Sequence, residues 1–169
     1  MLNDIAVSPA AADDQKARAA IARRATAAFG QIMALILRSP LHQALTVAQI
    51  RTVVAPVVMA GQFALAGRRF SEGGFVRPVA AVLWARVSET VDERLLASPH
   101  ADLVLKRDEL SSGDIIWILD VLGDGGAVQT LIGQLGTTQW AGQTVRVRTG
   151  AADRSIGVRT LGPFPAAAR

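Results

Sequence analysis

The stretch at residues 111–123 places the strongest constraint on how this chain folds. Seven of the eight residues from 115 to 122 are apolar, and glycines bracket the run, a pattern typical of a buried strand. Because side chains alternate across a strand, Asp120, the one polar residue, is expected to share a face with Ile116 and Ile118. A carboxylate buried without a partner is costly. Asp120 is therefore a candidate for chemistry, or else a strand-end residue that faces solvent or caps the next turn.

The composition predicts one folded domain. The chain has 169 residues, and half of them are hydrophobic, which is enough to build a core. We expect a flexible segment at residues 1–12, a single domain at residues 13–162 and a tail at residues 163–169.

The chain contains no cysteine, which excludes disulfides, thiolate nucleophiles and cysteine metal sites and fits a reducing compartment. Its apolar stretches are short or interrupted, and its first residues lack a basic leader followed by an apolar run. We therefore expect a cytoplasmic protein without a signal peptide or a membrane span. No metal-ligand pattern is recognisable, so no bound metal or cofactor is expected.

The net charge of +4 is concentrated at the end of the chain. Residues 141–169 hold five arginines against one acidic residue, whereas the charges of residues 1–140 balance. A basic tail suits an acidic partner, such as nucleic acid, an anionic membrane or an acidic carrier protein. We expect no nucleic acid as partner, because neither a recognition helix nor interleaved aromatic and basic residues stand out.

The first predicted helix begins at residue 13 or 14. Ile21, Phe29 and Ile36 recur near the helical period, so this helix has an apolar face. That face is expected to dock onto the domain or onto a second copy of the chain, which leaves a homodimer open.

Ser39, Pro40 and His42 form a second region of interest. Ser39 and Pro40 make a good helix start, with the serine as N-cap and the proline at the first helical position. His42 then falls in the first turn, where the positive helix end favours a neutral imidazole that can accept a proton. In the alternative interpretation, His42 only closes a corner between helices.

The remaining segments predict a mixed sheet. A capping box at residues 46–49 opens a helix that ends or kinks before Pro56. Hairpin-linked strands with intervening helices are typical of an α+β fold whose largely antiparallel sheet carries helices on its faces. The strands are expected at residues 62–67, 76–87, 115–122, 143–149 and 156–161, the helices at residues 89–97 and 127–135, and turns at residues 71–74 and 123–126.

Several short motifs follow one another in order along residues 32–127. They are Ser39-Pro-Leu-His42, Gln62-Phe-Ala-Leu65, Pro78-Val-Ala-Ala-Val-Leu-Trp84, Ser112-Gly-Asp-Ile-Ile-Trp-Ile-Leu-Asp120 and Gly123-Asp124. This series resembles the RTX toxin-activating lysine acyltransferases, the small cytoplasmic proteins that activate haemolysin and adenylate cyclase protoxins. The resemblance implies a GNAT-like acyltransferase fold, which agrees with the expected α+β arrangement.

The same resemblance implies an activity and a catalytic pair. Members of that family take a fatty acyl group from acyl-acyl carrier protein and attach it to internal lysines of a glycine-rich, calcium-binding toxin. Their catalytic histidine and aspartate correspond to His42 and Asp120 of this chain. The expected partners are acyl carrier protein, as the donor cosubstrate, and an RTX-type protein substrate. An acidic carrier would also suit the arginine-rich tail.

Lysine acylation explains why such a pair would be needed. A lysine with a pKa of about 10.4 must lose a proton to attack, which costs about 4.6 kcal/mol at neutral pH. His42 can take this proton as general base, while Asp120 orients the imidazole and stabilises its charged form. Two other routes stay open, because Asp120 could hold the lysine ammonium directly and His42 could form an acyl intermediate. Ser39, a supporting residue, is expected to cap the turn rather than to bond to His42.

Two other functions remain as alternatives. An acyl-CoA-dependent GNAT-type N-acyltransferase would cradle pyrophosphate in a glycine-rich turn between strand and helix, and residues 123–126 are suitably placed. Backbone N–H groups of this turn could also stabilise an oxyanion or bind phosphopantetheine. The second alternative is a non-catalytic relative that binds a partner through its basic tail.

Overall fold

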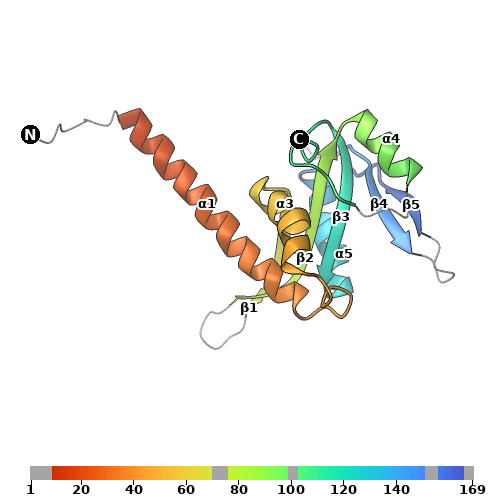
Figure 1. The fold of residues 1–169 in the computed structure, drawn as a ribbon, viewed down its shortest axis with the longest axis horizontal. Helices are drawn as coiled ribbons and strands as arrows, with labels where there is room; N and C mark the ends of the chain where they lie inside the picture. Colours follow the sequence, from red (N-terminus) through yellow and green to blue (C-terminus); the bar gives the residue numbers. More distant parts are fainter. Residues whose placement is uncertain (1–8, 70–75, 99–102, 151–155, 166–169) are drawn as a thin grey trace, which may run out of the picture.

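A five-stranded sheet forms the centre of the molecule (Figure 1). The computed structural model describes residues 9–69, 76–98, 103–150 and 156–165. The strands lie side by side in chain order and are β1 (Phe63–Arg69), β2 (Val76–Val87), β3 (Ile115–Gly123), β4 (Val145–Gly150) and β5 (Ile156–Leu161). Neighbouring strands are antiparallel except for β3 and β4, which run parallel and are joined through a helix, α5 (Gly125–Thr137).

This arrangement confirms the expected α+β fold with a mixed, largely antiparallel sheet, and it is consistent with a GNAT-like fold. The helical segments other than α5 are α1 (Pro9–Ile36), α2 (Val47–Gln49), the π-helical turn η1 (Ile50–Val54), α3 (Ala55–Met59) and α4 (Glu89–Ala97). α1 begins earlier than expected, at Pro9. The predicted flexible segment at residues 1–12 is wrong for residues 9–12, which belong to α1. Residues 1–8, the turn at residues 71–74 and the tail residues 166–169 lie outside the described residues.

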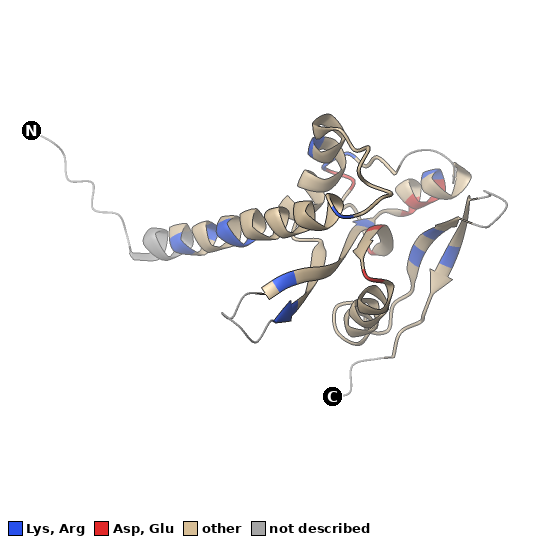
Figure 2. Ribbon diagram, turned by 90° about the horizontal axis from the view of Figure 1, so that it is seen from below, with Lys and Arg blue, Asp and Glu red and all other residues tan. Residues whose placement is uncertain are grey.

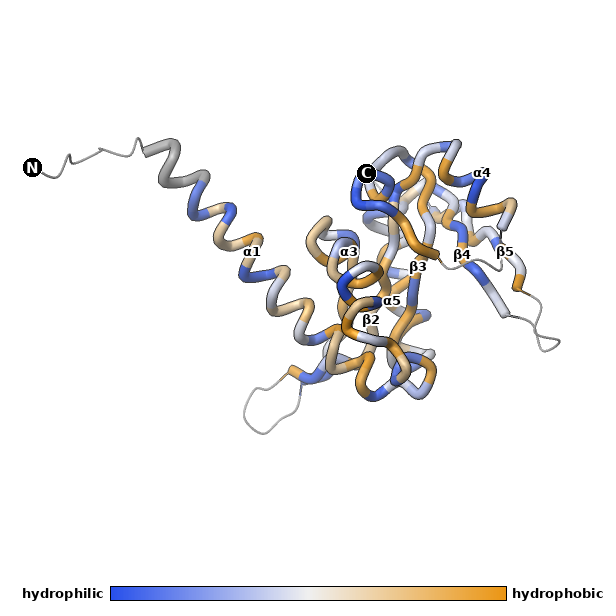
Figure 3. The backbone as a smooth tube through the Cα atoms, viewed as in Figure 1, coloured by the Kyte–Doolittle hydropathy of each residue, from blue (hydrophilic) through white to orange (hydrophobic). Residues whose placement is uncertain are grey.

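Helices cover both faces of the sheet and create two hydrophobic cores. On one face, which we call the α1 face, α1, α3 and α4 pack against strand residues such as Leu83 and Trp117. On the opposite face, the α5 face, α5 packs against strand residues that include Ile116 and Ile118. Figure 3 shows hydrophobic residues throughout the strands and the helices that cover them. The core to which a strand residue belongs therefore reports the direction of its side chain.

Only the second half of α1 packs on the sheet. Ala25, Ala28 and Ile32 are buried, whereas residues 15–24 are all exposed, and this part of the helix projects away from the sheet (Figure 1). Ile21 is 67% exposed. Within the described part of the chain, the expected apolar face is thus covered only from Ala25 onward.

The helical segment before β1 shows the effect of Pro56. Thr46 and Gln49 form the expected capping box, in which the Gln49 N–H donates to Thr46 Oγ1 and the Thr46 N–H donates to Gln49 Oε1. The helix widens into η1 directly before Pro56, where the Ala55 N–H donates to the Ile50 carbonyl. Proline lacks an N–H donor, and the helix accommodates it with this wider turn before it continues as α3.

Candidate active site

A bulge in β3 sets the direction of the Asp120 side chain. Leu83 of β2 pairs with Asp120, while the next residue of β2, Trp84, pairs with Ile118. Leu119 is therefore an extra residue in β3. An extra residue of this kind interrupts the alternation of side chains, so the residues beyond it change faces.

The bulge turns Asp120 toward the α1 face of the sheet. Its cross-strand partner Leu83 and its neighbour Leu122 both belong to the core of that face, whereas Ile116 and Ile118 belong to the core of the α5 face. The expectation that Asp120 shares a face with Ile116 and Ile118 is therefore wrong. The carboxylate lies instead on the side where the chain leaves α1.

His42 lies in the turn that follows α1. Residues 40–44 form successive turns and no helix, because the backbone bonds of this segment span three residues, from His42 to Ser39 and from Leu45 to His42. The expected helix start at Ser39 and Pro40 is therefore wrong. No helix begins at Ser39, so the imidazole of His42 lies outside the field of a helix N-terminus.

Ser39, His42 and Asp120 form one chain of hydrogen bonds. Ser39 Oγ lies 2.6 Å from His42 Nδ1, and His42 Nε2 lies 3.1 and 3.0 Å from Oδ1 and Oδ2 of Asp120. The Val121 N–H donates to Oδ1 of Asp120 at 2.8 Å. The expectation that Ser39 caps the turn rather than bonding to His42 is wrong, since its hydroxyl contacts His42 Nδ1. The structure thus brings together the three residues that the sequence singled out.

The two partners of His42 determine where its protons lie. An ionised carboxylate only accepts hydrogen bonds, so the Nε2–H of a neutral His42 donates to Asp120 and Nδ1 accepts from the Ser39 hydroxyl. Nδ1 is then the basic nitrogen, and Ser39 covers it. The side chains of His42 and Asp120 are 16% and 28% exposed, so the pair is largely withdrawn from water but open at its edge.

Burial raises the pKa of the Asp120 carboxyl above its usual range. The positive charge of His42, its hydrogen bond and the N–H of Val121 act in the opposite direction but do not cancel the effect of burial. A carboxyl with a raised pKa in contact with a histidine is the kind of pair that enzymes use for proton transfer.

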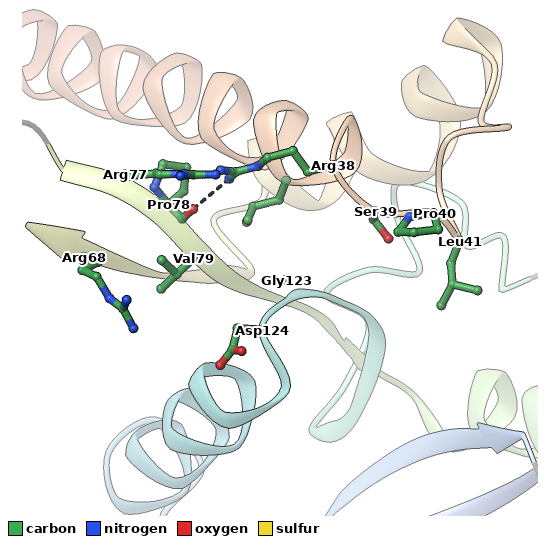
Figure 4. Close-up of a pocket in the computed structure, with 11 residues that line it drawn as sticks. Arg38, Ser39, Pro40, Leu41, Arg68, Arg77, Pro78, Val79, Gly123 and Asp124 are labelled. Carbon is green, nitrogen blue, oxygen red and sulfur yellow. Dashed lines mark hydrogen bonds between the residues drawn. The ribbon is translucent and has the colours of Figure 1, made fainter.

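The sheet opens next to this pair. β3 and β4 are paired only where Ile116–Ile118 faces Val145–Val147, so Asp120 and the end of β3 lie beyond their last contact. A pocket of about 550 Å³ is lined by Ser39 and Gly123 (Figure 4). Neither His42 nor Asp120 lines it, so Ser39 is the residue that connects the pocket to the pair. This volume falls in the range of small-molecule sites.

The described residues offer no metal site, because no group of three or more histidine and acidic side chains converges among them. None of the described helices combines the length and the apolar character that crossing a membrane requires.

A family model matches the chain over residues 21–160, and this model is that of the RTX toxin acyltransferase family. The chain belongs to this family. As a member of the RTX toxin acyltransferase family, the protein is an acyltransferase whose family activity is the acylation of RTX toxins. The family match extends beyond the motifs at residues 32–127 and includes part of α1 as well as β4 and most of β5. A search of curated proteins found no match.

Two features of the site escaped the sequence analysis. The bulge at Leu119 has no signature in the sequence, because apolar residues surround it on both sides. Of the arginines that line the pocket, Arg68 and Arg77 lie on the two strands of one hairpin, whereas Arg38 is 30 positions before Arg68 in the sequence. Only the strand register and the docking of α1 place them together.

Proposed function

We propose that this protein moves a fatty acyl group from acyl-acyl carrier protein to the ε-amino group of internal lysines in an RTX-type protoxin, in the cytoplasm. His42 acts as general base, and Asp120 orients and stabilises it. The observation that supports these roles most directly is the contact of His42 with Asp120 on one ring nitrogen and with Ser39 on the other. An imidazole held in this way presents one defined basic nitrogen.

The base is needed because the attacking group is an amine. At neutral pH, removing the proton from an ordinary lysine costs about 4.6 kcal/mol, and a base positioned beside the amine offsets this cost as the new bond forms. The carboxylate of Asp120 stabilises the imidazolium that results, because its negative charge lies 3.0 Å from Nε2.

Nδ1 is the nitrogen that receives the proton, and Ser39 stands between Nδ1 and the substrate. The lysine attacks as its neutral amine, after the ammonium form has given one proton to solvent. As its nitrogen bonds to the thioester carbonyl, a second proton passes from the nitrogen to Ser39 Oγ while the serine proton passes to Nδ1. The C–N bond forms, the C–S bond breaks, and the imidazolium returns the proton to the departing thiolate of the carrier. An acyl-histidine intermediate is disfavoured, because both ring nitrogens of His42 already hold hydrogen-bond partners.

The turn expected at residues 123–126 is shorter in the structure, because α5 begins at Gly125. The acyl-CoA alternative, which depends on this region, is less well supported. Pyrophosphate would bind to free N–H groups at the start of α5. Asp124 is the N-cap of that helix and its Oδ1 accepts the Ala127 N–H at 2.9 Å. A carboxylate at this position occupies one of these donors and repels an anion at the start of the helix, which disfavours a pyrophosphate there.

The decisive experiment is reconstitution with a glycine-rich RTX protein and two acyl donors. We expect intact-mass spectrometry to show lysine acylation with acyl-acyl carrier protein and little with acyl-CoA. Efficient transfer from acyl-CoA alone would favour the alternative donor. Absence of transfer from either donor to any lysine-bearing RTX protein would contradict the proposal.

A further inference from the structure

The pocket beside the candidate active site is lined by three arginines from three separate elements (Figure 4). Arg38 follows α1, Arg68 belongs to β1 and Arg77 belongs to β2. Figure 2 shows basic residues on both β1 and β2 near the ends of these strands. Asp124 supplies the only acidic side chain among the described residues of this lining, so the pocket carries three positive charges and one negative charge.

Arg68 and Arg77 face each other directly across the β1–β2 pair. Like charges at directly opposite positions of a sheet destabilise it. Nothing in the described part of the chain compensates this repulsion, since no described carboxylate lies within ion-pair distance of either guanidinium. An anion bound in the pocket that both residues line would offset this repulsion.

Arg38 is held in position by uncharged groups. Its Nε donates to the Ala34 carbonyl at 2.9 Å, and one Nη donates to the Pro78 carbonyl at 2.8 Å, as the dashed line in Figure 4 shows for Pro78. These carbonyls fix the guanidinium over β2 without neutralising its charge. Arg38 also lines the pocket, and neither of these two hydrogen bonds uses its other Nη.

The pocket and the hydrogen-bonded chain share a wall. Ser39 lines the pocket and also contacts His42 Nδ1, and β3 runs from Asp120 to the pocket edge at Gly123. A ligand whose charged end lies among the arginines can therefore extend along this wall toward His42.

We propose that Arg38, Arg68 and Arg77 bind the phosphate ester of the phosphopantetheine arm that carries the acyl group. Guanidinium groups recognise phosphate oxygens through paired, charge-assisted hydrogen bonds. The arm has a phosphate at one end and the thioester at the other, so the arginines fix the first and thereby direct the second to His42. This inference rests on the proposed function, because it assigns the donor-binding part of the same site.

The first test uses small probes and does not depend on catalysis. Binding of 4′-phosphopantetheine and of pantetheine, which lacks the phosphate, is measured by calorimetry on the wild type and on an Arg68→Gln, Arg77→Gln double variant. We expect the wild type to prefer the phosphorylated probe by about tenfold or more, the size expected for hydrogen bonds to charged groups. The double variant should lose most of this preference. An equal preference in both proteins would overturn the proposal.

Arg69→Gln is the matched control. Arg69 is the next residue of β1, pairs with Val76 and does not line the pocket. Its substitution removes one positive charge beside Arg68, and the Arg68→Gln single variant is the comparison of equal charge. We expect the preference to survive in this variant. If Arg69→Gln loses as much of the preference for the phosphorylated probe as the double variant does, the effect comes from general surface charge, which would contradict a defined site. Thermal unfolding should confirm that all variants remain folded, since these arginines are exposed.

The second test identifies the source of the phosphate. Holo-acyl carrier protein bears the arm, apo-carrier has the same acidic surface without it, and CoA presents the arm on a nucleotide. If the double variant weakens binding of the holo form only, the site and its carrier-borne ligand are supported. If the double variant binds CoA more weakly but binds both carrier forms as the wild type does, the phosphate site is supported and its ligand is CoA. Equal weakening of apo and holo carrier would overturn the proposal in favour of contacts with the carrier surface.

Steady-state kinetics separates this inference from the proposed function. With acyl-acyl carrier protein as donor, the double variant should raise KM for the donor by about tenfold while kcat changes little. A wild type that shows no transfer but still prefers phosphopantetheine would contradict the proposed function and leave the binding site intact. A fully active wild type with an unchanged donor KM in the double variant would contradict the binding site alone.

Discussion

Both carboxylate oxygens of Asp120 lie within hydrogen-bonding distance of His42 Nε2, although the two residues are 78 positions apart in the sequence. The extra residue Leu119 makes this contact feasible, because regular alternation along β3 would direct Asp120 to the α5 face. Bulges occur frequently beside active sites, where they redirect a side chain. The contact therefore depends on backbone geometry as much as on the two residues themselves.

Replacement of His42 tests the proposed general base. We expect His42→Ala to lower kcat/KM for lysine acylation by about 10²–10⁴-fold, the usual contribution of general acid–base catalysis. The fold should be retained, since His42 lies in a turn and is not part of either hydrophobic core. Added imidazole should restore part of the rate in this variant. Wild-type activity in a folded His42→Ala protein would rule out the assignment.

Replacement of Ser39 separates a proton relay from a nucleophile. If Ser39 only relays the proton to Nδ1, Ser39→Ala should retain partial activity, because a water molecule or the amine itself can reach Nδ1. A serine that carried the acyl group would instead be indispensable. Intact-mass spectrometry of the enzyme mixed with acyl donor but no protein substrate should show no covalent acyl adduct. An adduct that maps to Ser39 would contradict direct transfer.

The sequence was sufficient to predict most of the fold, because alternation, capping and turn residues act locally. The range of β2, the range of α4 and the Thr46 capping box agree with the structure. The helix that was expected to end or kink before Pro56 instead continues past it as α3, with a π-helical turn directly before the proline. The family was also recognisable, since its motifs occur in order.

Features that depend on long-range contacts could not be predicted in this way. The apolar neighbours of Leu119 fit a regular strand equally well, so the bulge follows only from the register between β2 and β3. Ser39 was expected to cap a helix, because local statistics favour that role. Its contact with His42, three residues further on, is local, and the prediction failed because this segment forms turns in which no helix begins at Ser39.

Replacement of Asp120 by asparagine tests the raised pKa. A carboxyl whose pKa is higher in the folded than in the unfolded state binds protons more readily in the folded state, so its contribution to stability falls as pH rises through both values. Burial raises the pKa of Asp120. Relative to wild type, Asp120→Asn should therefore gain stability between acidic and neutral pH, while acyl transfer is lost. Denaturant unfolding of both proteins across this pH range measures the difference, and the opposite slope would contradict the raised pKa.

Asp92 links α4 to two strands and is expected to be structural. It is 5% exposed, its Oδ1 accepts the Trp117 indole N–H at 2.7 Å, and its Oδ2 lies 2.8 Å from Arg146. Asp92→Ala would leave the buried indole N–H without a partner, which should reduce the free energy of unfolding by about 1–3 kcal/mol. Asp92→Asn keeps an acceptor for the indole and should cost less. Equal losses in the two variants would mean that the ion pair dominates.

The final prediction concerns Gly123, the last residue of β3, which also lines the pocket. Gly123 has a φ of +97°, and a Cβ atom added there would lie 2.1 Å from the Val79 carbonyl oxygen, which also accepts the Asp124 N–H at 3.0 Å. Gly123→Ala must therefore distort the end of β3, and we expect a loss of stability above about 1 kcal/mol together with a higher KM for the acyl donor. Gly125→Ala is the control, because a Cβ atom there meets nothing within 4 Å. Thermal unfolding and donor kinetics on both variants test this, and comparable effects at the two glycines would contradict a special role for Gly123.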